Sequence, residues 1–472
     1  MCLKHYHHIV AVFRLRPFQL SINYVAISKN LAMNRILFVR EVCLSLVAIA
    51  IVLILSPTNA AEPTIDVPEL LRQRADLDYS DTPRRVMAFY YPWYGLPEGP
   101  GGKGRTMHWG HIDARNKDIE ASTNYPTIGA YDSHDPELIE RHCMWVKEAG
   151  IDTLIVSWWG HGEYSDVAVP QILDACRAKG ISVALYYETC PNPKSPEATA
   201  RDLARIVERH GRHPAYLKVN GKPVIFIYVR AVEQLGLTGW LRTASLLKKS
   251  PETDAVLIGD NLSFGAANVF DGIHTYNTAG KIRQKSVDTI RDWANSRYPE
   301  WTTIADRSGR ISTLTIIPGY DDTKIRKPGL AVPRHNGRSY AAQWEQAIEA
   351  DPHWVLITSF NEWHEGSEIE PSVEFGRAYL DLTAKYAKRF KAQRDRKERS
   401  SSALGGISQA ELTRLRERLA GKTIGVLPNP ESRAFWFLAA EVQAELRSVS
   451  WQDIAAGIVT PKRYPFLLYA RV

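Results

Sequence analysis

The chain has 472 residues, of which 44% are hydrophobic and 24% are charged. This composition is typical of a globular enzyme and excludes a fibrous or disordered chain. The formal net charge of +7 suggests a nucleic-acid binder. However, the positive excess lies in residues 1–60 and 385–399, and the rest of the chain is net negative. We therefore expect no basic groove and no nucleic-acid partner.

The N-terminus has the pattern of a secretory signal. Two arginines precede an apolar run at residues 42–55, and a small-residue site ends at Ala60. The run is shorter than the roughly 20 apolar residues that a membrane span needs. We expect a signal peptide from Met33 to Ala60, a secreted or periplasmic protein, and no stable membrane span after cleavage. An uncleaved anchor is the alternative, and residues 1–32 are interpreted as an over-extended start.

Five cysteines are present, and two of them fall before the predicted cleavage site. Cys143, Cys176 and Cys190 remain, so at most one pair can close. Their spacing matches no zinc motif. The sequence also lacks the HExxH motif, the dinucleotide GxGxxG motif and a serine nucleophile elbow, so we expect no metal and no cofactor.

A lead-in at residues 61–83 precedes a long region, residues 84–390, in which apolar runs alternate with amphipathic stretches. This alternation is typical of parallel strands covered by helices. Most of the runs are continuously apolar, as in strands buried on both faces. Eight runs predict a closed (β/α)8 barrel, the TIM barrel. The predicted strands are 86–93, 153–159, 182–188, 224–229, 256–260, 272–277, 313–319 and 354–360.

A charged, Ser/Gly-containing linker at residues 391–407 leads into a different pattern at 408–472. This pattern predicts a small C-terminal β-α-β extension. Such a unit cannot bury its apolar strands by itself. Either it docks on the barrel or the chain is a truncated two-domain protein, and both interpretations stay open. The predicted elements are a helix at 408–419, a strand at 423–427, a helix at 432–446 and a strand at 466–470.

Several predicted strands end in polar or aromatic residues. The carboxyl ends of barrel strands meet at one mouth, where active sites form, so we expect the chemistry there. We interpret one such end, Asp321-Asp322, as an exposed turn. The others are Trp93-Tyr94, Trp158-Trp159, Glu188, Asp260, Tyr276 and Asn361-Glu362.

Glu362 and Glu365 follow the eighth predicted strand directly. Two carboxylates at one barrel mouth are what a glycosidase needs, one to donate a proton and one to act as nucleophile or base. Proximity separates their pKa values. Asn361, Trp363 and His364 flank the pair and join the predicted substrate-binding set. The alternative is a solvated acidic loop.

Six separated segments, in order over about 300 residues, resemble glycoside hydrolase family 99, the endo-α-mannosidases and endo-α-mannanases. The region that resembles the family is 84–390. The segments are FYYPWYG (89–95), MHWGH (107–111), YDSHDPELIERHCMWVKEAGIDTLIVSWWG (131–160), HPAYLKVNGKPVIFIY (213–228), FDGIHTY (270–276) and TSFNEWHEGSEIEP (358–371).

The resemblance implies a retaining hydrolase of internal α-mannosidic linkages. Glu365 corresponds to the general acid/base. Glu362 corresponds to the residue that deprotonates the sugar's 2-hydroxyl, so that a 1,2-anhydro sugar forms. The residues alone equally allow Glu362 to be a direct nucleophile.

The resemblance also implies supporting sugar contacts at the mouth. Tyr94 and His108 match the opening motifs and are expected to hydrogen-bond sugar hydroxyls. Trp159 matches an aromatic residue of the sugar subsite next to the cleavage point, and Tyr276 is expected to contact sugar in a similar way. Glu188 resembles a carboxylate near the cleavage point, although this chain reads YYETCP where relatives read a Glu-Pro-Tyr-like end. Core packing is the alternative for the aromatic residues, and a structural role is the alternative for His108.

Two other functions fit the same sequence. One is a barrel hydrolase of another α-glycan, such as an α-1,3-glucan. The other is a carbohydrate-binding barrel without turnover. A pure binder has no need of a general acid, so the presence of both Glu362 and Glu365 speaks against it.

Overall fold

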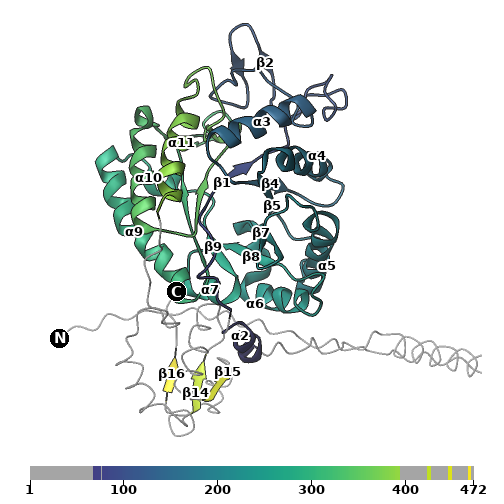
Figure 1. Ribbon diagram of the computed structural model, residues 1–472, viewed down its shortest axis with the longest axis vertical. Coiled ribbons are helices and arrows are strands. Elements are labelled where there is room, and N and C mark those ends of the chain that lie inside the picture. The colour runs from purple at the N-terminus through teal and green to yellow at the C-terminus, as the bar shows by residue number, and fades with distance from the viewer. Residues whose placement is uncertain (1–66, 76, 394–422, 427–444, 449–465, 469–472) are drawn as a thin grey trace, which may run out of the picture. The chain divides into compact units, whose positions relative to one another are not determined.

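The computed structural model describes residues 67–75, 77–393, 423–426, 445–448 and 466–468. The predicted signal peptide and most of the predicted linker lie outside these residues. The main body is a closed barrel of eight parallel strands with helices around it (Figure 1). The barrel strands are β1 (Arg85–Tyr90), β4 (Thr153–Trp158), β5 (Ser182–Tyr187), β7 (Lys222–Ile227), β8 (Val256–Asp260), β9 (Gly272–His274), β10 (Ile311–Ile316) and β13 (Trp354–Ile357).

Neighbouring strands pair in the order β5-β4-β1-β13-β10-β9-β8-β7, and a further pairing of β5 with β7 closes the ring. This confirms the predicted (β/α)8 barrel. Each predicted strand corresponds to one barrel strand, although the observed strands end up to three residues earlier. The residues after each strand turn into the loops of the mouth, and these loops carry the candidate site.

Helices between the strands form the outer layer (Figure 1). Local signals fix several of their starts. The Asp135 carboxylate accepts a hydrogen bond from the Glu137 amide, and the Ser195 hydroxyl accepts one from the Ala198 amide, so both residues cap a helix that begins with proline. The helices are α2 (Val67–Ala75), α3 (Pro136–Glu148), α4 (Tyr164–Lys179), α5 (Pro196–Ile206), the π-helix η1 (Val207–Gly211), α6 (Val229–Leu247), α7 (Phe264–Val269), α8 (Ala279–Ile282), α9 (Val287–Arg307), the 3-10 turn η2 (His335–Gly337), α10 (Arg338–Ala350), the 3-10 turn η3 (Trp363–Glu365) and α11 (Ala378–Lys391).

Strand alternation divides the core into two layers. In β1, Val86 and Ala88 belong to the outer cluster beneath the helices, whereas Met87 and Phe89 belong to the cluster that fills the barrel. Successive side chains of a strand point to opposite faces, so this alternation is expected. Tyr91 continues the alternation of Met87 and Phe89 and therefore belongs to the inner cluster, at the mouth of the barrel.

Several two-residue strands lie outside the eight strands of the barrel. β2 (Ile112–Asp113) pairs with β3 (Asp118–Ile119), and β6 (Lys218–Val219) pairs with the start of β7. After β10, β11 (Tyr320–Asp321) pairs with β12 (Ala331–Val332) and holds the loop between them.

The C-terminal extension differs from its prediction. β14 (Thr423–Val426) and β16 (Phe466–Leu468) are the two predicted strands. β15 (Glu445–Ser448) is a third strand, where the sequence predicts the end of a helix. β15 and β16 flank β14 in a parallel sheet. The prediction was wrong at residues 445–446 because a strand in a parallel sheet gains its hydrogen bonds from distant residues, which override helical periodicity. The rest of both predicted helices lies outside the described residues.

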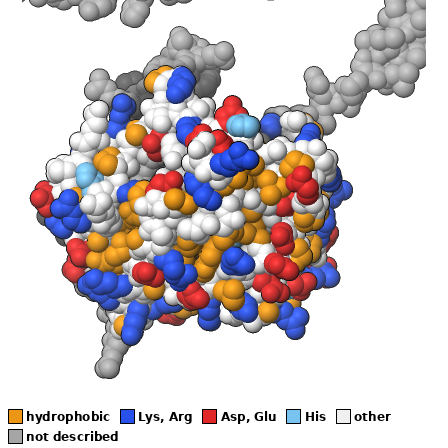
Figure 2. Space-filling model, turned by 90° about the horizontal axis from the view of Figure 1, so that it is seen from above, with side chains coloured by type: hydrophobic (Ala, Val, Ile, Leu, Met, Phe, Trp, Pro, Cys, Tyr) orange, Lys and Arg blue, Asp and Glu red, His pale blue; other side chains and the backbone are white. Residues whose placement is uncertain are grey.

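No helix among the described residues is long and apolar enough to cross a membrane. On the described surface in Figure 2, acidic and basic side chains are interspersed with apolar ones.

Candidate active site

Glu362 and Glu365 lie on one short turn at the barrel mouth. Glu362 caps η3, because its Oε1 accepts a hydrogen bond from the His364 amide at 3.2 Å. Its own amide donates to the Ser359 hydroxyl at 2.7 Å. Glu365 ends the same turn. Capping and short spacing therefore hold both carboxylates on one rigid element directly after β13.

The two glutamates line a cavity of about 120 Å³. Six predicted site residues share it, and Tyr94, His108, Asn361 and Trp363 are not among its lining residues. The predicted members are Trp159, Glu188, Tyr276, Glu362, His364 and Glu365. The members outside the predicted catalytic and substrate-binding set are Tyr91, Trp93, Tyr186, Tyr228, Arg230, Ile325 and Arg326, of which Trp93 was already expected as a strand end at the mouth.

Glu365 has two groups of donors. The Tyr276 hydroxyl donates to its Oε2 at 2.9 Å, and both terminal nitrogens of Arg326 donate to its Oε1 at 3.3 and 3.4 Å. Burial raises the pKa of Glu365, and these donors offset only part of that rise. A carboxyl with a raised pKa can carry a proton near neutral pH.

Glu362 is more isolated. Burial raises its pKa well above the ordinary value, and the nearby charge of Glu365 adds to the rise. The His364 ring lies 3.5 Å from Oε1. Oε2 is buried and has no hydrogen-bond partner among the described residues. A buried acceptor without a donor is uncommon in folded proteins.

Two further buried acids stand at the ends of β5 and β8, on either side of β7. Glu188 accepts a hydrogen bond from the Ser157 hydroxyl at 2.8 Å, and burial raises its pKa to about 7. Burial also raises the pKa of Asp260 to about 7. Asp260 accepts from the Tyr186 hydroxyl at 3.4 Å. Several acids therefore share one mouth with few cations.

Aromatic rings form the walls. Trp159 is 37% exposed, its indole nitrogen donates to Ser157 at 3.1 Å, and the Arg230 guanidinium lies 4.9 Å from its ring centre. Trp93 stacks on His108 with ring centres 4.9 Å apart. Flat, partly exposed rings suit the apolar faces of sugars. His108 thus lies behind Trp93, and its predicted contact with sugar stays a prediction.

Three other predicted residues lie beneath the turn. The Tyr94 hydroxyl accepts a hydrogen bond from the Trp363 amide at 2.9 Å. Asn361 bonds both the amide and the carbonyl of Tyr91, which ties the loop to the end of β1. Trp363 donates to Tyr131 and Glu370. All three are fully buried and brace the turn, and sugar contact by any of them stays a prediction.

The acidic loop is not solvated. Glu368 pairs with Arg334 at 2.6 Å. Glu370 accepts from the Tyr131 hydroxyl at 2.8 Å and from Trp363 at 3.1 Å. Both carboxylates are buried, so the alternative of a solvated loop is wrong for this structure. The loop is held because each acid meets a donor from another loop of the barrel, Arg334 for Glu368 and Tyr131 for Glu370.

The interpretation of Asp321-Asp322 as an exposed turn is also wrong for Asp322. This residue is buried and accepts hydrogen bonds from Arg326 at 2.5 Å, Tyr320 at 3.0 Å and the Leu330 amide at 2.6 Å. Asp322 thereby orients Arg326 toward Glu365. The pairing of β11 with β12 brings the Leu330 amide to Asp322, whereas Tyr320 and Arg326 lie close to it in the sequence.

The missed cavity residues differ in how detectable they are. Tyr91 and Trp93 belong to an aromatic run at the end of β1, and Tyr186 and Tyr228 lie at the ends of β5 and β7. The sequence already marks Trp93 as a strand end, and the same signal would have found the other three. Arg326 lies within a loop and carries no such signal.

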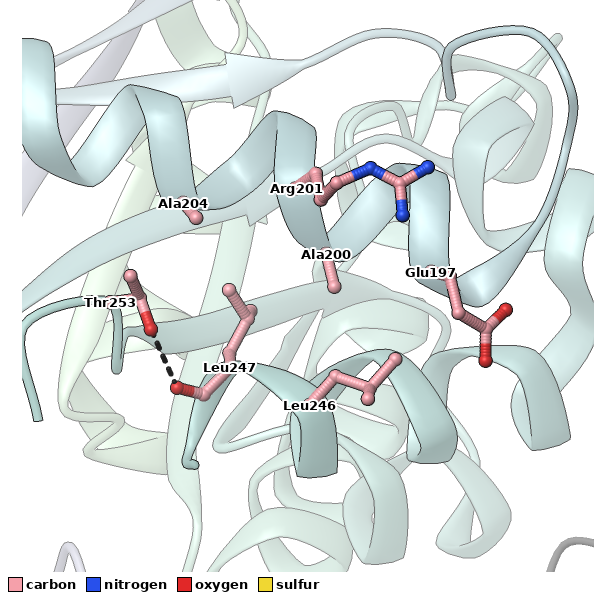
Figure 3. A pocket seen from close by; sticks show the side chains of 7 residues that line it. All are labelled: Glu197, Ala200, Arg201, Ala204, Leu246, Leu247 and Thr253. Atoms are coloured by element: carbon pink, nitrogen blue, oxygen red, sulfur yellow. Dashed lines mark hydrogen bonds between the residues drawn. The ribbon is translucent and has the colours of Figure 1, made fainter. Parts of the chain in front are cut away.

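A larger hollow of about 250 Å³ lies between α5 and α6 on the outside of the barrel (Figure 3). Apolar side chains such as Leu246 and Leu247 line it, with Arg201 and Glu197 at one side. It holds no pair of carboxylates. Among the described residues, no cluster of three or more His, Cys, Asp or Glu could hold a metal ion.

Comparison with known proteins agrees with this geometry. The family model described as Glycosyl hydrolase family 99 matches residues 82–395. A glycoprotein endo-alpha-1,2-mannosidase of Mus musculus is 28% identical over 65% of this chain and 75% of its own. A glycoprotein endo-alpha-1,2-mannosidase-like protein of Homo sapiens is 30% identical over 64% of this chain and 72% of its own.

A solved structure shares the fold. The GH99 endo-alpha-mannosidase from Bacteroides thetaiotaomicron is 28% identical, with a TM-score of 0.54, over 66% of this chain and 99% of its own. The match spans the barrel and includes both glutamates of the mouth. The chain therefore belongs to glycosyl hydrolase family 99 and is a glycoside hydrolase.

Proposed function

We propose that this protein is an exported, endo-acting hydrolase of α-mannosidic linkages in mannan or mannose-containing glycans, which retains anomeric configuration. The observation that carries the proposal is the pair of carboxyls on one turn, Glu362 buried and Glu365 largely buried, with raised pKa values, in a cavity with aromatic walls. The names of the relatives, endo-alpha-1,2-mannosidases, support the choice of mannose.

In the proposed first step, Glu365 donates its proton to the glycosidic oxygen and Glu362 removes the proton of the sugar's 2-hydroxyl. That oxygen displaces the leaving group at the anomeric carbon and gives a 1,2-anhydro sugar. In the second step, Glu365 takes a proton from water, which opens the anhydro ring, and Glu362 returns its proton to the 2-oxygen. Two inversions give net retention.

The surroundings of Glu362 support the role of base. Its Oε2 is buried without a partner among the described residues, so it can accept a hydrogen bond from an entering hydroxyl. Its raised pKa makes the carboxylate, once it has lost its proton, a stronger base than an exposed glutamate. The same atom could also attack the anomeric carbon, which is the nucleophile alternative.

A 2-deoxy substrate separates the two roles. If Glu362 acts on the 2-hydroxyl, the analogue binds, resists hydrolysis and inhibits, whereas the parent glycan with its 2-hydroxyl is cleaved. Mass spectrometry of enzyme quenched during turnover then shows no sugar on the peptide that contains Glu362. Near-normal hydrolysis of the analogue, or a glycosyl ester on Glu362, would restore the nucleophile.

Substrate class is tested by incubation with α-mannan and with α-1,3-glucan, followed by detection of new reducing ends. We expect new reducing ends from mannan and none from the glucan. The products should be oligosaccharide fragments, as expected when internal linkages are cleaved. Cleavage of the glucan would favour the other α-glycan hydrolase. Tight binding of mannan without new ends would indicate a binding barrel.

Export is tested on the N-terminus. If residues 33–60 are a signal peptide, the protein recovered outside the cytoplasm begins at Ala61. Recovery of the chain in the membrane fraction with this segment still attached would instead indicate an anchor.

A further inference from the structure

Two of the three described cysteines face each other across a helix pair. Cys143 lies on α3 and Cys176 on α4, 33 positions apart in the chain, and their Sγ atoms are 3.5 Å apart. Both side chains are buried, at 1% and 0% exposure, in the outer core cluster. Neither residue lines the catalytic cavity.

We propose that Cys143 and Cys176 form a disulfide bond that links α3 to α4 when the protein folds in an oxidising compartment. A disulfide has its sulfur atoms about 2.0 Å apart, so the two atoms need to approach by roughly 1.5 Å. Side-chain rotation within two packed helices can supply such a movement. Cys143 and Cys176 are therefore already close enough to form the bond after a small movement.

The third cysteine serves as an internal comparison. Cys190 follows β5, and its thiol contacts the Ala231 carbonyl at 3.6 Å. The structure gives it no contact with another described cysteine. One pair and one single thiol are the arrangement that three cysteines allow.

The chemistry needs a two-electron acceptor, and an oxidised dithiol such as a small-molecule or protein disulfide supplies it. The Cys143 thiolate attacks one sulfur of the acceptor, breaks its S–S bond and forms a mixed disulfide. The Cys176 thiolate then attacks the Cys143 sulfur and releases the second acceptor thiol. Both cysteine protons are lost, and the acceptor ends as two thiols.

The electrostatics favour this order of events. The hydrogen bond from Cys176 lowers the pKa of Cys143, and the charge of Lys179 adds to the effect. The pKa of Cys176 is raised by the same contact and by burial. Once the two helices are in contact, Cys143 is therefore the thiol that ionises more readily. Because both groups are buried in the folded protein, the acceptor reacts while α3 and α4 are still assembling.

The bond would join two consecutive strand–helix units around β4, which ends beside Trp159 of the cavity wall. Such a link stabilises chiefly by restricting the unfolded chain. We therefore expect a higher Tm for the oxidised protein and equal hydrolysis rates for both redox forms at temperatures where both are folded. The inference does not depend on the proposed substrate.

The test uses the full chain, made in a host with an oxidising cytoplasm and purified without reductant. The protein is unfolded in denaturant in the presence of iodoacetamide, which labels free thiols. It is then digested and its peptides are mapped by mass spectrometry. We expect label on Cys190, and on Cys2 and Cys43 of the full chain, together with a cross-linked Cys143–Cys176 peptide pair that lacks two hydrogens. Reduction before labelling should leave all five cysteines labelled and lower the Tm.

Two variants complete the design. Cys143→Ala should leave Cys176 labelled and abolish the Tm difference between oxidised and reduced protein. Cys190→Ala should retain the cross-link and that difference. Label on both Cys143 and Cys176 in unreduced wild-type protein, or a cross-link that includes Cys190, would overturn the proposal.

Discussion

The two ends of the barrel both bury carboxylates, but they treat them in opposite ways. At the amino end of the strands, Asp271 pairs with Arg74 at 2.9 Å and also accepts hydrogen bonds from Tyr79 and the Leu257 amide. Burial raises the pKa of Asp271, but Arg74, Lys248 and the amide outweigh it and leave the pKa below its ordinary value.

At the carboxyl end, Glu188, Asp260, Glu362 and Glu365 crowd together, and their pKa values are all raised, chiefly by burial. At the amino end, the acid is paired with a cation and stabilises the fold. At the carboxyl end, cations and hydrogen-bond donors do not fully offset the cost of burying the charges, so these acids can exchange protons near neutral pH. Buried acids with raised pKa values persist only where the surrounding structure holds them in place.

The strongest test of the catalytic end is Glu365→Gln. General-acid help matters most when the departing oxygen is basic, so we expect losses of about 10²- to 10⁴-fold on glycans and far smaller losses on activated aryl glycosides. Stability should be unchanged or higher, because a buried ionisable group is removed. Equal losses on both substrate types would remove Glu365 from the role of acid.

The strongest test of the structural end is Asp271→Asn. This change leaves Arg74 as an uncompensated buried charge, and we expect the free energy of unfolding to fall by about 3–5 kcal/mol. The rate constant for hydrolysis by the folded fraction should not change. Asp288→Asn, in an exposed pair with Arg291, is the control, with an expected loss below about 1 kcal/mol. Similar losses for both variants would contradict the contrast between buried and exposed pairs.

The two ends should also respond to pH with opposite signs. Glu188 has a raised pKa, about 7 against an ordinary 4.5, so the folded state binds its proton more tightly than the unfolded state does. Its contribution to stability is present at low pH and is lost as the pH rises from 4.5 to 7, by on the order of 3 kcal/mol. Asp271 has a lowered pKa, so its contribution is lost only as the pH falls below its ordinary 3.8.

Urea unfolding of Glu188→Gln at several pH values measures this effect. The variant should gain stability relative to wild-type protein at pH 8 and show no such gain at pH 4. Glu197→Gln, which changes a partly exposed acid on the outer helix α5, is the control. A gain that is the same at both pH values would show that Glu188 does not titrate as inferred.

A smaller effect is expected from Arg326→Met. Removal of the cation raises the pKa of Glu365 further, so the alkaline limb of the profile of kcat/KM against pH should move upward. Because Arg326 is half exposed, solvent limits the shift to about one pH unit or less. Lys324→Met, on the same loop but paired with Asp118, is the control. A shift toward lower pH would exclude this role of Arg326.

The smallest effect is expected from removal of the C-terminal extension. Every residue that lines the cavity lies between Tyr91 and Glu365. A chain that ends at Ser400 should therefore keep its kcat/KM. A soluble but inactive product would show that the extension contributes to catalysis.

The sequence predicts the barrel well because its signals are local and repeated. Eight apolar runs alternate with amphipathic stretches, and each corresponds to one barrel strand. Strand ends were less accurate, since hydrogen bonding to neighbours decides where a strand stops. The helix predicted at residues 432–446 was wrong at residues 445–446 for the same reason, because β15 exists through its pairing with β14.

The candidate site divides in the same way. The sequence by itself placed Glu362 and Glu365 together, because three positions on one short turn fix their proximity without help from distant residues. Strand phase and strand ends likewise carried Glu188 and Tyr276 to the mouth.

Only the tertiary structure decided which charges meet. The contact of Arg326 with Glu365, and the burial of Glu368 beside Arg334, each join different loops of the barrel. Among the residues that the structure describes, no donor reaches Oε2 of Glu362, and this too follows from how the surrounding loops pack. Burial and pairing set the pKa values, and both are properties of residues brought together from distant parts of the chain.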